Sequence, residues 1–144
     1  MMLWRGSLIT KYMGADLYRS FKSGEKKGAK VPILGFERSD RAVNVGYFRD
    51  PYNSGSVLNM YGLSWWQHVV PMQDKEGILA TAKVKKLRSM LDDELLEKNL
   101  TTAEWYGGKK FDEKDKEDIR DGARLLRKFL DECVKDKDTI EASL

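Results

Sequence analysis

The chain has 144 residues, of which 41% are hydrophobic and 34% are charged, and its formal net charge is +3. This length suits one domain covering 1–144, and the hydrophobic share is too high for a disordered chain. No apolar run approaches the roughly 18 residues of a membrane span. Arg5 and Lys11 interrupt any signal sequence at the N-terminus, and the lone cysteine cannot form an internal disulfide. We therefore expect a single-domain protein of the cytoplasm with no membrane contact.

Apolar and polar residues alternate along much of the first half, which is typical of half-buried strands. This pattern predicts strands at 3–12, 31–37, 41–49 and 56–62. Residues 14–23 are ambiguous: Leu17, Tyr18 and Phe21 would share one helical turn, whereas Leu17, Arg19 and Phe21 alternate as in a strand. We favour a short helix there.

Apolar residues spaced by three and four predict one helix from 74 to about 91 and another from about 113 to 134. Asp112 is the expected N-cap of the second helix, whose acidic first turns and final lysines suit the helix dipole. The apolar seam of this helix consists of Ile119, Ala123, Leu126, Leu130 and Cys133. Between the helices, a threonine and a glutamate in capping-box spacing, followed by two glycines, predict a short helical turn at 101–108. Residues 138–144 are expected to be a frayed tail.

Strands followed by helices predict an α+β fold. We expect an N-terminal antiparallel sheet of about four or five strands, packed against two long C-terminal helices and a short helical turn. Residues 1–73 would be mainly strands and residues 74–137 mainly helices, within a single domain.

The residue inventory gives catalysis little support. His68 is the only histidine, so a serine or cysteine nucleophile would have a single candidate base. Cys133 falls on the apolar seam of the last helix, where a thiol stays protonated. One histidine and one cysteine cannot build a usual zinc site, and no glycine-rich phosphate motif is present. We predict no catalytic residue, no cofactor and no metal; an enzyme built on carboxylates and arginines stays open as a third hypothesis.

Two basic features suggest an anionic partner. Arg120, Arg124, Arg127 and Lys128 would fall within an arc of about 100° on one side of the last helix. In the first half, aromatic and basic residues are interleaved, as in proteins that hold single strands by stacking. A nucleic-acid or nucleotide-phosphate binding protein is therefore the second hypothesis, although acidic residues within the arc could form an ion-pair network instead.

Residues 51–73 contain no charged side chain and are rich in aromatic residues and methionine, which is the composition of an interface core. A buried strand with its exit loop would show the same composition. If 63–70 is a strand rather than a helix, Trp65 and Trp66 face opposite sides. The helices of the same chain would then cover one tryptophan, and a partner subunit or ligand would cover the other, with His68 lending a hydrogen bond. The candidate binding residues are Trp65, Trp66, His68, Tyr52 and Tyr61.

The first hypothesis is therefore a non-catalytic interaction or regulatory protein. It would bind a protein partner or a small ligand and would act as a homo-oligomer, with a dimer as the expected state. Both long helices carry apolar seams that could pack on a copy of themselves.

Overall fold

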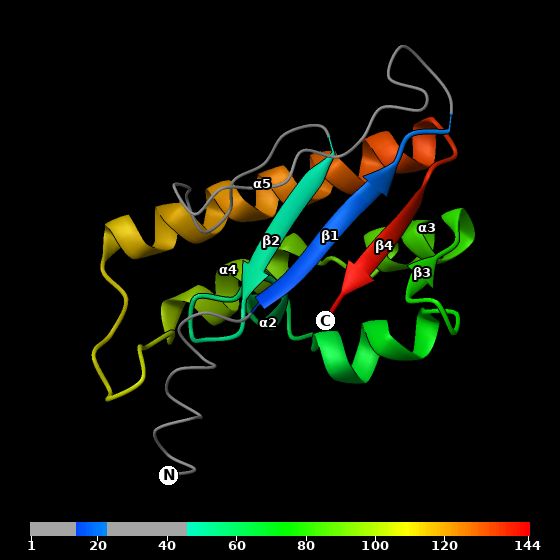
Figure 1. Cartoon of the computed structure of the whole chain (residues 1–144). Helices are drawn as coiled ribbons and strands as arrows, with labels where there is room; N and C mark the ends of the chain where they lie inside the picture. Colours follow the sequence, from blue (N-terminus) through cyan, green and yellow to red (C-terminus); the bar gives the residue numbers. More distant parts are fainter. Residues whose placement is uncertain (1–13, 23–45) are drawn as a thin grey trace, which may run out of the picture.

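The computed structural model of the chain describes residues 14–22 and 46–144. The strands predicted at 3–12 and 31–37 lie outside these residues, as does the first part of the strand predicted at 41–49. Within the described residues, four strands form one antiparallel sheet with the order β2-β1-β4-β3 (Figure 1). The strands are β1 (Gly14–Ser20), β2 (Tyr47–Pro51), β3 (Ile78–Leu79) and β4 (Thr139–Ser143).

Helices lie on one face of this sheet, and α5 runs across it (Figure 1). The helical elements are α2 (Val57–Met60), a π-helical turn (Trp65–Val69), a 3-10 turn (Val70–Met72), α3 (Thr81–Ser89), α4 (Asp93–Thr101) and α5 (Glu113–Lys135). The fold is α+β, as predicted. Among the described residues α5 is the one long helix, so the prediction of two long C-terminal helices is only partly met. In this part of the chain, no helix has the length and apolar character that crossing a membrane would require.

The strands bury alternate residues against the helices. In β1, Leu17 is fully buried, whereas the neighbouring Asp16 is partly exposed on the opposite face. Leu17 lies opposite Phe48 of β2 and Ala142 of β4, so the three strands share one apolar layer. Phe48 in turn packs on Phe129 of α5, with ring centroids 6.4 Å apart. The core therefore lies between the sheet and α5.

The helix α5 follows the sequence prediction closely. The Asp112 side chain accepts a hydrogen bond from the backbone N–H of Asp115, and the Asp115 side chain accepts one from the backbone N–H of Asp112. This capping box begins the helix, and Asp112 is the N-cap as predicted. The predicted seam is buried: Ile119, Ala123, Leu126, Leu130 and Cys133. After the helix, Lys137 adopts a left-handed conformation with φ of 58°, which turns the chain towards β4.

The helix predicted at 74–91 begins later than expected. The Asp74 side chain accepts hydrogen bonds from the backbone N–H groups of Glu76 and Ile78, and Gly77 has a φ of 81°. These contacts fix a turn that leads into β3, so α3 starts only at Thr81.

The helical turn predicted at 101–108 is wrong. The chain leaves α4 and folds back on itself, with a β-bridge between Glu104 and Lys110. Gly107 and Gly108 have φ values of 105° and 91°, so they form the tip of this turn rather than stop a helix.

Residues 138–144 are not a frayed tail, because 139–143 form β4 between β1 and β3. Ile140 is fully buried, and Asp138, also fully buried, anchors the start of the strand. The Nε of Arg19 donates to Asp138 Oδ2 at 2.6 Å, and the backbone N–H of Lys22 donates to Oδ1 at 2.8 Å. Since an unpaired charge is costly in the interior, this ion pair holds β4 in one position beside β1.

Three further segments differ from the predicted elements or decide between alternatives. Within 14–23, for which a short helix was favoured, Gly14–Ser20 forms β1, and residue 23 lies outside the described residues. The strand predicted at 56–62 is wrong, because its first half forms α2. The alternatives left open for 63–70 resolve as helical turns. The last two outcomes have a common cause in Asp50, at the end of β2.

Candidate functional site

Asp50 is fully buried and organises the chain that follows β2. Its Oδ1 accepts a hydrogen bond from the backbone N–H of Val57 at 2.8 Å. Its Oδ2 accepts from Ser56 Oγ at 2.7 Å, from the backbone N–H of Leu58 at 3.1 Å and from Trp65 Nε1 at 2.8 Å. A carboxylate at free backbone N–H groups stabilises a helix start. Asp50 therefore begins α2 and fixes the indole of Trp65.

The sequence prediction missed Asp50 and Ser56. Ser56 is the N-cap of α2, and its Oγ accepts a hydrogen bond from the backbone N–H of Asn59 at 3.2 Å. The available signal was a serine directly before an apolar run, which is a helix-start pattern. It competed with strand-like alternation in the same residues.

Trp65 and Trp66 have different surroundings, as predicted, but on a helical turn rather than on a strand. Ser64 caps the turn, and its backbone N–H donates to His68 Nδ1 at 2.9 Å. Trp65 and Val69 are buried one turn apart. Trp66, rotated by about 100° from Trp65, keeps 58% of its surface exposed. The two tryptophans are thus a core residue and a surface residue.

Tyr52 lies beside the exposed tryptophan, with the ring centroids of Tyr52 and Trp66 6.2 Å apart. We call these two side chains the Trp66 surface. The Tyr52 hydroxyl is buried and has no hydrogen-bond partner among the residues that the structure describes. Burial, with the nearby carboxylates of Asp16 and Asp50, raises the pKa of Tyr52 to about 12. Tyr52 therefore presents a neutral aromatic ring at the edge of Trp66.

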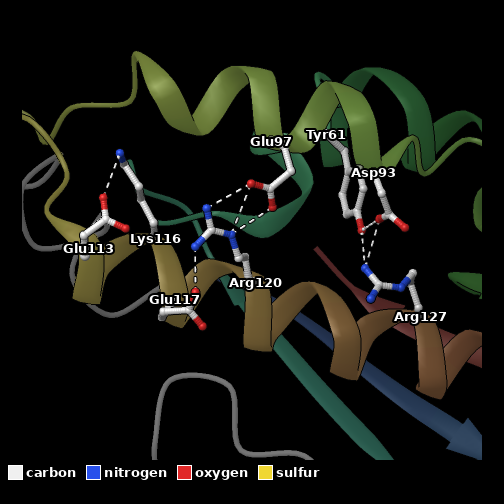
Figure 2. A network of polar contacts seen from close by, with 8 residues as sticks. All are labelled: Tyr61, Asp93, Glu97, Glu113, Lys116, Glu117, Arg120 and Arg127. Carbon is white, nitrogen blue, oxygen red and sulfur yellow. Dashed lines mark hydrogen bonds and ion pairs between the residues drawn. The ribbon is translucent and has the colours of Figure 1, made fainter.

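Of the other predicted binding residues, Tyr61 lies elsewhere and His68 has a local role. Tyr61 is 1% exposed, and its hydroxyl donates to Asp93 Oδ1 at 2.6 Å and accepts from Arg127 NH1 at 2.9 Å (Figure 2). The Nδ1 of His68 accepts a hydrogen bond from the backbone N–H of Ser64 within the same turn. Neither residue belongs to the Trp66 surface as defined.

The predicted basic stripe on α5 is largely paired with carboxylates. Arg120 bonds Glu97 of α4 through Nε and NH2, at distances from 2.9 to 3.2 Å, and Glu117 through NH1 at 2.6 Å (Figure 2). These bonds raise the pKa of Arg120, and the guanidinium lowers the pKa of Glu97. Arg120 therefore joins α4 to α5 rather than offering a free cation.

The remaining members of the stripe differ in their partners. Arg127 NH1 donates to Asp93 at 3.0 Å, beside Tyr61, and Arg124 NH2 donates to Asp121 at 3.2 Å. Lys128 is exposed and makes no hydrogen bond or ion pair with the described residues. The contacts of the three arginines match the ion-pair network more closely than an open anion site.

The described residues give no support for metal binding or thiol chemistry. They contain no group of three or more histidine, cysteine, aspartate or glutamate residues that could hold a metal. Cys133 is fully buried on the α5 seam, and burial raises the pKa of its thiol to about 12. The thiol thus stays protonated near neutral pH.

No family model, curated protein or solved structure matches this chain. Two surfaces of the described residues are therefore the candidate binding sites: the exposed tryptophan beside Tyr52, and the charged side of α5.

Proposed function

We propose that this protein is a non-catalytic binding protein that associates with a second copy of itself through the Trp66 surface. The exposure of Trp66 carries the proposal: 58% of this large apolar side chain is accessible, on a turn that is otherwise fixed. Tryptophan is enriched among the residues that dominate binding energy at protein interfaces.

The turn below Trp66 is held in place before any partner binds. The Trp65 indole is bonded to the buried Asp50, and Ser64 and His68 are bonded to each other. A side chain presented from a fixed backbone loses less conformational entropy on association than one on a mobile loop. The Trp66 surface is therefore preorganised for contact.

The charge pattern favours a second copy as the partner. In a two-fold dimer, the same patch of both subunits meets, so any charge on the patch faces its own sign near the axis. The segment 51–73, which carries both Tyr52 and Trp66, has no charged side chain. This segment therefore adds no like-charge repulsion when it meets its copy, and depletion of charge is typical of interface cores.

Sedimentation equilibrium with the full chain tests the proposal. We expect a concentration-dependent dimer, and we expect Trp66→Ala to raise the dissociation constant about 30-fold, as loss of a hot-spot side chain does. Tyr106→Ala is the matched control, because Tyr106 is 100% exposed but lies on the turn between α4 and α5. It should leave the dissociation constant unchanged.

Circular dichroism melts of both variants confirm that each remains folded. A wild-type chain that stays strictly monomeric up to about 100 μM would overturn the proposal. So would a Trp66→Ala dimer as stable as the wild type.

A further inference from the structure

The side of α5 that bears the basic stripe contains an open hollow of about 340 Å³, separate from the Trp66 surface. It is lined by Arg124, Arg127, Lys128, Asp131, Glu132 and Lys135. All six residues come from the second half of α5, so the hollow is a stretch of helix surface with four cations and two carboxylates. The ligand that this hollow can bind depends on which of these charges are already paired within the protein.

The two carboxylates of the hollow are engaged by arginines outside it. Asp131 accepts a hydrogen bond from Arg88 Nε of α3 at 2.8 Å, and Glu132 lies 3.6 Å from Arg19 NH1 of β1. Arg127 is likewise engaged, with Tyr61 and Asp93. These pairings offset the three charges in part, but Asp131 and Glu132 keep 57% and 35% of their side chains exposed, so both carboxylates still face a ligand in the hollow.

The lysines of the hollow are different. Lys128 and Lys135 are exposed, and neither makes a hydrogen bond or ion pair with any residue that the structure describes. Lys135 follows Lys128 by seven positions, so the two lysines lie on the same side of the helix, about 10 Å apart along its axis. Arg124, one turn before Lys128, has a single 3.2 Å bond to an exposed aspartate. The weakly paired or unpaired side chains of the hollow are therefore cations, and they are spaced along the helix at Arg124, Lys128 and Lys135.

We infer that this hollow binds an acidic peptide segment in the polyproline II conformation, in which glutamates at every third position lie on one side of the chain, about 9–10 Å apart. The position of Asp131 and Glu132 between Lys128 and Lys135 decides the class of ligand. A nucleic-acid backbone carries a charge about every 3.4 Å per strand, so some phosphates would meet these carboxylates. A peptide can place neutral or basic residues opposite them.

Fluorescence anisotropy with the full chain tests this inference. The probe is a labelled peptide of about twelve residues with glutamate at every third position and proline elsewhere, which favours the polyproline II conformation. We expect it to bind and to be released by added salt. The double variant Lys128→Glu/Lys135→Glu should weaken binding at least about tenfold, since it replaces two attractions with two repulsions.

The matched control is Lys85→Glu/Lys86→Glu, which makes the same change in net charge at two exposed lysines of α3. We expect it to weaken binding less than about threefold, the effect of net charge alone. Equal weakening by the two double variants would overturn the inference, as would absence of binding at low salt. Tighter binding of a single-stranded oligonucleotide, lost in Lys128→Glu/Lys135→Glu, would replace the peptide with a nucleic acid.

Discussion

Asp50 and Arg120 each make four hydrogen bonds, yet the two residues lie in opposite surroundings. Asp50 is fully buried, and its four donors are neutral groups. Arg120 lies at the surface between α4 and α5, and both of its carboxylate partners are at least half exposed. Asp50 and Arg120 therefore make the same number of hydrogen bonds but differ in burial.

The two regions therefore differ in how much they contribute to the stability of the fold. Water can replace the partners of Arg120 but cannot reach the partners of Asp50. Exposed ion pairs contribute little because both charges are well solvated when apart. We therefore expect the stability of the protein to depend on Asp50 far more than on the ion pairs of α5.

The largest expected effect is that of Asp50→Ala, which leaves the hydroxyl of Ser56, two backbone N–H groups and the Trp65 indole N–H without an acceptor. We expect a loss of about 3–5 kcal/mol in the free energy of unfolding, measured by urea denaturation. Asp92→Ala is the matched control: Asp92 caps α4 with two hydrogen bonds to its side chain but is exposed. Its loss should cost about 1 kcal/mol. Equal losses in the two variants would contradict the role given to burial.

An intermediate effect is expected at Tyr61, whose buried phenol contacts the exposed Asp93–Arg127 pair. Burial, followed by the hydrogen bond to Asp93, raises the pKa of Tyr61 from its usual value of 10 to about 12. The folded state thus favours the neutral phenol. This contribution to stability is complete below about pH 10 and is lost as the pH rises to about 12.

The variant Tyr61→Phe removes this titration. At neutral pH we expect it to be about 1 kcal/mol less stable than the wild type, because it lacks the hydroxyl bonds. The difference should narrow between pH 10 and pH 12, measured by urea denaturation across that range. A difference that stays constant would show that the phenol does not titrate between those values in the way the structure requires.

The smallest effect is expected for Arg120→Met, which removes four hydrogen bonds while keeping most of the aliphatic stem. The free energy of unfolding should fall by less than about 1 kcal/mol, and the difference should shrink further in about 1 M salt. Chemical denaturation by urea, with and without salt, measures both. A loss as large as that of Asp50→Ala would erase the contrast between the two regions.

The sequence predicts best those parts of the fold that are set by local residues. The spacing of apolar residues and the Asp112 cap lie within α5 itself, so the helix could be placed almost to the residue. An antiparallel sheet was also expected, but in the first half of the chain, whereas β3 and β4 follow residue 73; β2 overlaps the end of the strand predicted at 41–49. Both outcomes rest on local sequence patterns.

Elements set by distant partners could not be predicted in this way. β4 is short and carries an exposed glutamate, and it becomes a strand because it pairs with β1, more than 100 residues earlier. The segment 56–62 alternates like a strand but starts a helix because Asp50 accepts the N–H groups of its first turn. Neither contact is visible in a local pattern.

The candidate site shows the same limit. The different surroundings of Trp65 and Trp66 were expected, but the strand interpretation could not say which tryptophan is exposed. The indole bond from Trp65 to Asp50 decides this, across 15 residues. On α5, the four stripe residues lie on one helix as expected, but the pairing of Arg120 with Glu97 depends on how α4 packs.

The placement of β4 also has a consequence for the order of folding. β3 reaches the rest of the sheet only through β4, and β4 is reached only after α5. Before β4 docks, β1 and β2 form a two-stranded ribbon, which has little stability in water. Closing a loop of this length is slow compared with forming a helix. We therefore expect the sheet to be completed late in folding, after α5 has formed.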